Sequence, residues 1–239
     1  MTASIRSITS ITSITSITSI TLTVAAMLVM AAVVAGHPVA RADGTIRGRV
    51  RVPVPPPVAG RPAVADLSAS PHVAVDRRRV VVYLESAPRQ AFADLSTPRA
   101  RIEQRGEQFI PRILAVTTGT VVDFPNNDRT FHDVFSLSRV RAFDLGRYPP
   151  GKTGSIRFDR PGIVPIFCDI HSHMSAYVLV FSHPFFAVSD ADGRYEIPGV
   201  PAGTYSVAVW SELGNTAPRR VTVQEGAATE TDFEVLRQP

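Results

Sequence analysis

Residues 162–181 read GIVPIFCDIHSHMSAYVLVF, and this stretch consists of two apolar runs on either side of a short polar loop. The runs GIVPIFC and SAYVLVF have the length and composition of buried β-strands, and neither has the periodicity of a helix. The loop between them contains Cys168, His171 and Met174. A tight loop at the end of a strand can direct all three side chains at one centre, so the stretch predicts both a β fold and a cluster of ligands.

The rest of the chain has the character of a globular β protein. It contains 239 residues, of which 44% are hydrophobic and 19% charged, and it is long enough for one large or two small domains. Its 20 prolines and 15 glycines punctuate Val-rich runs, which predicts short strands joined by turns and hence an all-β fold. The pattern is densest at 101–182, as expected of a compact antiparallel sandwich.

The first 42 residues differ from the remainder of the chain. Arg6 precedes a low-complexity Ile-Thr-Ser tract, an apolar run at 21–36 and an Ala-x-Ala pattern that ends at Ala42. This order predicts a secretory signal peptide at 1–42, and therefore a periplasmic or otherwise exported protein. An uncleaved membrane anchor is the alternative, although the apolar run is shorter than the roughly 20 residues of a spanning helix.

Cys168 is the only cysteine of the chain. An exported protein with a single cysteine has no internal disulfide, so the thiol is buried and inert, joined to another molecule, or a metal ligand. The methionines bear on these alternatives. Met1, Met27 and Met30 precede the expected cleavage site, which leaves Met174 as the only thioether of the mature chain.

The residue types in this region match one kind of copper site. A copper ion that changes oxidation state binds a soft thiolate and two imidazoles, with a thioether as a weak axial ligand. Cys168, His171 and Met174 supply three of these groups. His132 follows an Asn-Asn turn and precedes an apolar run, so it is placed to supply the second imidazole. We therefore expect one copper ion here, with His173 as an alternative to His171 or Met174.

The segment 106–181 also resembles the cupredoxins, and its Cys-x-x-His-x-x-Met loop has the length of the amicyanin ligand loop. The stretches VDFPNND, FHDVF and AYVLV follow the plastocyanin and amicyanin pattern. Such chains are often labelled methylamine utilisation or plastocyanin-like proteins. The resemblance implies a Greek-key β-sandwich at 100–182.

The same resemblance implies a role for each candidate ligand. Cys168 would be the thiolate that binds copper most strongly, and Met174 the weak axial ligand that tunes the reduction potential. His132 and His171 would be the equatorial imidazoles. His171 is expected to be partly exposed and to face a redox partner.

Two positions depart from the family pattern. Asp133 stands where the residue after the first histidine ligand is usually Asn, and a carboxylate there would favour the oxidised site or take up a proton. Ile170 stands where Pro is common, which bears on the rigidity of the loop.

The C-terminal part resembles a second family. The turn DADGRY at 190–195 and the segment PAGTY at 201–205 follow the pattern of carboxypeptidase regulatory-like (transthyretin-like) β-sandwiches. GTIRGRV at 44–50 matches the usual first strand of such a module. We therefore expect residues 43–90 and 184–239 to form one discontinuous module into which the cupredoxin-like domain is inserted. Two separate small domains are the alternative.

Several other side chains are expected to be structural. The run NND at 126–128 reads as a turn, because Asn and Asp bend the backbone locally. Trp210 is expected to pack within the C-terminal module, and His72 and His183 to lie at the surface. Four phenylalanines are expected in the core: Phe124, Phe131, Phe135 and Phe167.

Composition and site together predict the function. The formal net charge of +4 comes from scattered arginines with no Lys/Arg run, which argues against nucleic-acid binding. We expect an exported type 1 (blue) copper protein that carries single electrons, and not an enzyme. A copper-handling or partner-binding module without a redox role is the alternative. The resemblance suggests an amine dehydrogenase and a c-type cytochrome as partners.

Overall fold

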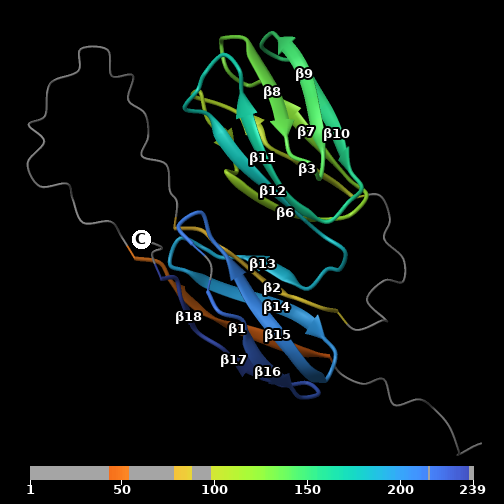
Figure 1. Cartoon of the computed structure of the whole chain (residues 1–239), viewed down its shortest axis with the longest axis vertical. Helices are drawn as coiled ribbons and strands as arrows, with labels where there is room; N and C mark the ends of the chain where they lie inside the picture. The colour runs from red at the N-terminus through yellow and green to blue at the C-terminus, as the bar shows by residue number, and fades with distance from the viewer. Residues whose placement is uncertain (1–42, 54–77, 88–97, 215, 237–239) are drawn as a thin grey trace, which may run out of the picture. The chain divides into compact units, whose positions relative to one another are not determined.

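The computed structural model describes residues 43–53, 78–87, 98–214 and 216–236. The expected signal peptide and His72 lie outside the described residues. The regular elements of the described chain are β-strands (Figure 1), so the predicted all-β class is confirmed. Within these ranges no helix has the length and apolar content needed to cross a bilayer.

The strands between residues 99 and 181 form the first sandwich. They are β3 (Arg99–Arg101), β4 (Glu103–Gln104), β5 (Phe109–Ile110), β6 (Ile113–Thr117), β7 (Thr120–Pro125), β8 (His132–Leu137), β9 (Ala142–Tyr148), β10 (Thr153–Phe158), β11 (Gly162–Cys168) and β12 (Ser175–Phe181). One sheet has the order β10-β7-β3 and the other β6-β12-β11-β8-β9, while β4 pairs with β5. The second sheet places β8 beside β11 and β6 beside β12, which are pairs of strands distant in sequence, as in a Greek key.

Alternating side chains build the core of the first sandwich. On β7, Val122 and Phe124 are buried while their neighbours are partly exposed. On β11, Val164, Ile166 and Cys168 are buried in the same alternation. Cys168 therefore ends a row of core-facing side chains, at the point where the strand leaves the sheet.

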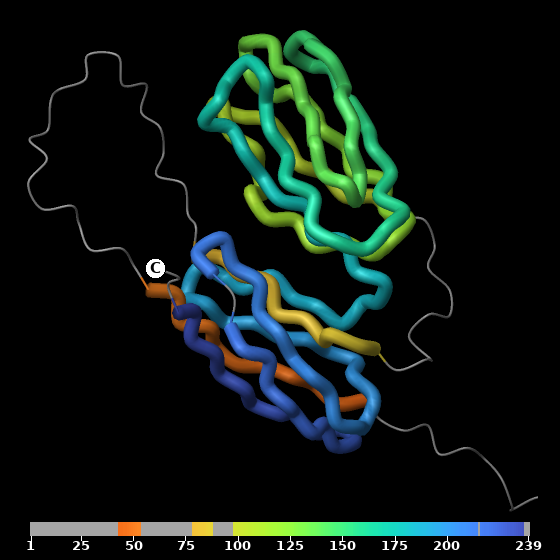
Figure 2. The backbone as a smooth tube through the Cα atoms, in the orientation of Figure 1, coloured from red at the N-terminus to blue at the C-terminus, as the bar shows by residue number. Residues whose placement is uncertain are grey.

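The remaining strands form the second sandwich. They are β1 (Gly44–Arg51), β2 (Val81–Leu84), β13 (Phe186–Val188), β14 (Arg194–Val200), β15 (Gly203–Trp210), β16 (Arg219–Val223), β17 (Ala228–Glu230) and β18 (Phe233–Glu234). One sheet has the order β14-β1-β17, with β18 also paired to β1, and the other has the order β13-β2-β15-β16. The orange trace of β1 lies among the blue C-terminal strands (Figure 2), antiparallel to β14 and parallel to β17 and β18.

The pairing of β1 joins two parts of the chain that are far apart in sequence. Gly48 lies opposite Tyr195 of β14, and the side chains of Ile46 and Ile197 are fully buried in the shared core. The expected discontinuous module depends on this pairing. Its boundaries stay a prediction.

Three of the four phenylalanines are outside the buried core, and one of these, Phe135, is partly buried. Phe124 is fully buried, but Phe131 is 53% exposed and Phe167 is 38% exposed. Phe167 lies between two buried residues of β11 and so points to the opposite face of the sheet. Phe131 directly precedes β8, where the sheet does not cover it. The prediction that these two side chains are buried is therefore wrong.

The prediction that His183 lies at the surface is also wrong, because the residue is only 5% exposed. Its Nε2 lies 3.0 Å from the carbonyl oxygen of Leu84, and its Nδ1 accepts a hydrogen bond from Phe185 N–H at 3.2 Å. Burial lowers the pKa of His183. These contacts show a neutral ring that satisfies backbone groups between the two sandwiches.

Substitution of Gly48 tests the pairing of β1. A Cβ at this position would overlap the carbonyl of Thr231, so Gly48→Ala must push β1 away from the C-terminal strands. We expect the free energy of unfolding to fall by about 3 kcal/mol, the cost of overpacking. Gly199→Ala is the control, because a Cβ there meets open space and only the positive φ of 69° is strained, at a cost of about 1 kcal/mol. Equal losses in denaturant unfolding would contradict the prediction.

Candidate metal centre

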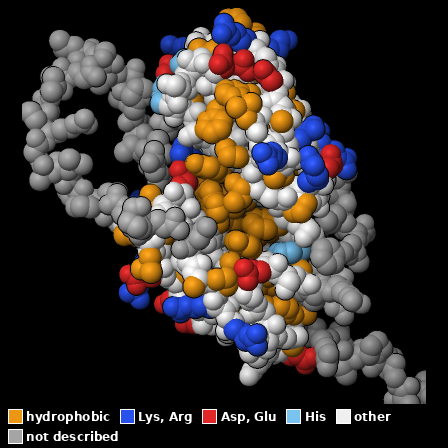
Figure 3. Space-filling model, viewed as in Figure 1, with side chains coloured by type: hydrophobic (Ala, Val, Ile, Leu, Met, Phe, Trp, Pro, Cys, Tyr) orange, Lys and Arg blue, Asp and Glu red, His pale blue; other side chains and the backbone are white. Residues whose placement is uncertain are grey.

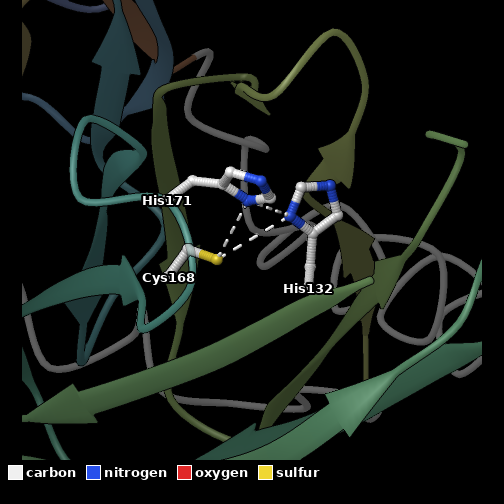
Figure 4. A group of neighbouring side chains, drawn as sticks. All are labelled: His132, Cys168 and His171. Carbon is white, nitrogen blue, oxygen red and sulfur yellow. Dashed lines mark hydrogen bonds between the residues drawn. The ribbon is translucent and has the colours of Figure 1, made fainter. Parts of the chain in front are cut away.

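Three donor atoms converge at one end of the first sandwich (Figure 4). The Sγ atom of Cys168 lies 3.7 Å from Nδ1 of His132 and 3.8 Å from Nδ1 of His171, and the two Nδ1 atoms are 3.1 Å apart. The point equidistant from the three atoms lies about 2.1 Å from each, which is the length of an ordinary metal–nitrogen bond. The residues present therefore fit a small metal ion.

The strand order brings these residues together. His132 is the first residue of β8 and Cys168 the last residue of β11, and the two strands are neighbours with Cys168 opposite Val134. His171 lies in the loop that leads from β11 to β12. His132, 36 residues away from Cys168 in the sequence, thus reaches the loop from a neighbouring strand end, as predicted.

Met174 is the last residue of the same loop. It is 1% exposed and belongs to the same buried cluster as Cys168. Its N–H donates a hydrogen bond to the carbonyl of His171 at 2.9 Å, which closes the loop between the two residues. The Met174 side chain is therefore buried in the core of the first sandwich.

The two histidines of the loop differ in position. Among the described residues the donor cluster contains His171, whose side chain is 17% exposed, and not His173. The His173 side chain is 42% exposed, and its Nε2 lies 3.6 Å from a carboxylate oxygen of Glu107. His132 and Cys168 are buried more deeply, at 0% and 4% exposed. His171 is therefore the donor nearest to solvent.

Asp128, which the sequence indicated only as a turn former, contacts His132 directly. Its Oδ2 lies 2.8 Å from Nε2 of His132, and its carboxylate also accepts hydrogen bonds from the N–H groups of Gly106 and Glu107. With a metal bound, a proton on Nε2 would leave the Nδ1 lone pair of His132 free to bind the ion, and a carboxylate that accepts the Nε2–H group is the usual partner of a metal-binding histidine. The only sequence signal was a carboxylate four residues before the histidine.

Hydrogen bonds lower the pKa values of two side chains that contact His132, Asp128 and Cys168. Burial works against the charge of Asp128, but the hydrogen bonds from Glu107 N–H and His132 outweigh it and lower the pKa of Asp128. Burial likewise opposes the thiolate of Cys168, but the hydrogen bond from His132 is among those that lower its pKa to about 6. The thiolate, which is the form that binds a metal, is therefore favoured at neutral pH.

Asp133 directly follows His132 on β8 and is 7% exposed. Burial raises its pKa to about 6, and the nearby charge of Asp144 adds to this effect, while Arg147 opposes it. Its Oδ1 has no hydrogen-bond partner among the described residues. The residue that follows His132 is thus a carboxyl group that resists ionisation.

Comparison with known proteins finds one family model that matches part of the sequence. The profile of the carboxypeptidase regulatory-like domain matches residues 175–236, which include β12 of the first sandwich and the C-terminal strands of the second. No curated protein sequence matches the chain.

Solved structures of copper proteins are similar to part of the chain. A purple cupredoxin from Nitrosopumilus maritimus is 20% identical over 34% of this chain and 99% of that chain, with a TM-score of 0.33. Amicyanin from Paracoccus versutus is 19% identical over 42% of this chain and 97% of that chain, with a TM-score of 0.33. A copper-containing nitrite reductase from Thermus scotoductus is 24% identical over 36% of this chain and 23% of that chain, with a TM-score of 0.34.

The strand order and the site define the class of the two parts. The described residues combine a Greek-key sandwich, which carries the His-Cys-His donor cluster, with a second sandwich whose C-terminal strands fall within the match to the carboxypeptidase regulatory-like domain.

The raised pKa of Asp133 predicts a pH dependence of apoprotein stability. Its folded-state pKa of about 6 lies above the ordinary value of 3.8, so the folded state binds the proton more tightly than the unfolded state. The contribution of this one carboxyl to stability is therefore most favourable below about pH 4 and is lost as the pH rises through about 6. We expect Asp133→Asn to remove this loss and to raise the free energy of unfolding by up to about 3 kcal/mol near pH 7, with little effect near pH 4.

The measurement is denaturant unfolding of the metal-free protein at both pH values. Asp159→Asn is the control, because the Asp159 side chain is 59% exposed. Parallel pH profiles for Asp133→Asn and the wild type would show that Asp133 carries no such cost.

Proposed function

We propose that this protein is an exported electron carrier that holds one type 1 copper ion between His132, Cys168, His171 and Met174. The observation that carries the proposal is the convergence of Cys168 Sγ with Nδ1 of His132 and His171. A thiolate, two imidazoles and a thioether are the ligand set of blue-copper electron-transfer sites. Copper in such a site supplies one-electron chemistry by alternating between Cu(II) and Cu(I).

The protein's own part is to hold the donors still. His132 and Cys168 stand at the ends of two neighbouring strands, and both are buried. The backbone hydrogen bond from Met174 to His171 fixes the loop that carries the other two donors. Rigid donors suit electron transfer, because little reorganisation then accompanies a change of oxidation state.

The surroundings of His171 support contact with a redox partner. Ile170, the residue directly before His171, is an exposed apolar side chain. Apolar side chains also gather in a band on the face drawn in Figure 3, whereas charged side chains are dispersed around it. We propose that such apolar surface, and not a charged patch, docks the partners, for which an amine dehydrogenase and a c-type cytochrome are candidates in the periplasm.

An optical spectrum of the copper-loaded protein tests the ligand set. We expect an intense visible thiolate-to-copper band that is absent from Cys168→Ser and present in His173→Ala, because the Cys168 sulfur is the donor and His173 lies outside the cluster. The band should bleach and return reversibly in electrochemistry. A protein without this band, or one whose band survives Cys168→Ser, is not a blue-copper carrier. Tight Cu(I) binding without an accessible Cu(II) state would indicate copper handling instead.

Replacement of Asp128 tests the orientation of His132. Asp128→Asn keeps an acceptor for the Nε2–H group but removes the negative charge. We expect copper affinity to fall by about ten-fold, the lower end of the effect of such outer-shell changes, and the reduction potential to rise because Cu(II) loses more stabilisation than Cu(I). Asp159→Asn controls for the loss of one surface charge. Unchanged affinity and potential in Asp128→Asn would exclude this role.

A further inference from the structure

We propose that Glu212 of the second sandwich is a positioning residue for the copper-ligand loop of the first, and that it acts through Arg112 on Ser175. The proposal rests on the proposed function, because it concerns the axial ligand Met174, which directly precedes Ser175. Both sandwiches belong to the same unit of the chain, Arg41–Pro239.

Arg112 connects the two residues with four hydrogen bonds. Its Nε and one terminal nitrogen donate to the two carboxylate oxygens of Glu212, each at 2.7 Å. Its other terminal nitrogen donates to the carbonyl of Ser175 at 2.6 Å and lies 2.9 Å from the hydroxyl of the same residue. The planar guanidinium thus joins a bidentate carboxylate on one side to the backbone of the ligand loop on the other.

Burial makes this connection stiff. The side chains of Arg112 and Glu212 are 15% and 6% exposed, so solvent screens the pair little. By contrast, the Arg47–Glu230 pair of the second sandwich is 52% and 73% exposed. Loss of one partner from a shielded pair leaves the other charge unpaired, whereas an exposed pair loses almost nothing.

Arg112 also holds the strand that follows the loop. Its backbone carbonyl accepts a hydrogen bond from Tyr177 N–H at 2.8 Å, and its guanidinium lies 5.8 Å from the centre of the Tyr177 ring. One residue therefore fixes β12 at Ser175 and again at Tyr177. These contacts restrict the backbone of Ser175, the residue that directly follows Met174.

The backbone around Glu212 is itself held by contacts of its neighbours. It lies in the turn after β15, where Ser211 Oγ accepts a hydrogen bond from Leu213 N–H at 3.0 Å. Trp210, the last residue of β15, has its ring centre 5.1 Å from that of Tyr177. Trp210 thus packs against a cluster that contains residues of both sandwiches, and not within the C-terminal module alone as expected from the sequence.

In a blue-copper site, the position of the axial ligand is the one most affected by such protein contacts. We call the contacts from Glu212 through Arg112 to Ser175 the brace. Its bond to copper is long and weak, so the metal itself does little to hold the thioether in place. Surrounding protein must fix the position of Met174, and the reduction potential depends on that position. The contacts from Glu212 through Arg112 to Ser175 hold the backbone next to Met174, and Glu212 lies outside the cupredoxin-like sandwich.

Three full-length variants test the brace. Arg112→Lys keeps the positive charge but removes the guanidinium, which contacts Glu212 and Ser175 at the same time. Glu212→Gln keeps the shape of the side chain but removes the negative charge that Arg112 binds through two hydrogen bonds. Glu230→Gln is the matched control, because it removes one acid of the second sandwich from an exposed pair. Hydrogen exchange of the backbone amides at 169–177 in the metal-free protein is the first measurement. The ratio of the thiolate-to-copper bands and the reduction potential of the copper-loaded protein are the second.

We expect about ten-fold faster exchange in the loop of Arg112→Lys and Glu212→Gln, an altered band ratio, and a reduction potential shifted by up to about 59 mV, which is a ten-fold change in a one-electron equilibrium. Glu230→Gln should match the wild type. Wild-type exchange and band ratio in both folded variants would overturn the brace, as would lower thermal stability without a change in the loop. If Arg112→Lys does not fold, Ser175→Ala, which removes only the hydroxyl acceptor, decides by the same loop exchange.

The two proposals fail in different ways. A wild-type protein without a thiolate-to-copper band refutes the copper function, whereas the exchange comparison in metal-free protein still decides whether Glu212 positions the loop.

Discussion

The pairing of β8 with β11 is the constraint on which the metal centre depends. It places Cys168 opposite Val134, two residues beyond His132. Donors that are 36 positions apart in the sequence therefore lie at the same end of two neighbouring strands. A slip of one residue would turn Cys168 to the opposite face. The buried side chains of Val164 and Ile166, which precede Cys168 on the same face, oppose such a slip. The hydrophobic core therefore fixes the geometry of the polar cluster at its edge.

Hydrogen bonds around His132 connect the cluster to a second loop. Burial opposes a charge on this ring, but hydrogen bonds to Cys168 and Asp128 outweigh it and raise the pKa of His132. Asp128 in turn holds the backbone of Gly106 and Glu107. The ring orientation, the thiolate and the neighbouring loop are thus parts of one network, in which removal of a single acceptor affects all the others.

The sequence predicts the donors because their residue types are scarce and chemically specific. A single cysteine with histidine and methionine at fixed spacing has few structural explanations, and the alternation of β11 and β12 places them at a strand end. Asp128 was not predictable as a contact of His132, because an Asx turn and a second-shell carboxylate look the same in sequence. The link from Arg112 to Glu212 spans 100 positions and depends on how strands from two families of module meet. Local patterns carry no information about such contacts.

Three carboxyl groups near the donor residues bear on the charge of the site. Asp128 lies against His132, Asp133 lies beside it with a pKa raised by burial, and a carboxylate oxygen of Glu107 lies 4.0 Å from Nε2 of His171. A cation held by the donors would interact favourably with the negative charges of the Asp128 carboxylate and the Cys168 thiolate, whose pKa values are both lowered. A positive ion among the donors lowers the cost of each charge together, so metal binding and folding stability are linked at this end of the sandwich. The Arg112–Glu212 pair is electrically neutral as a whole, so it can hold the loop at Met174 while adding little to that field.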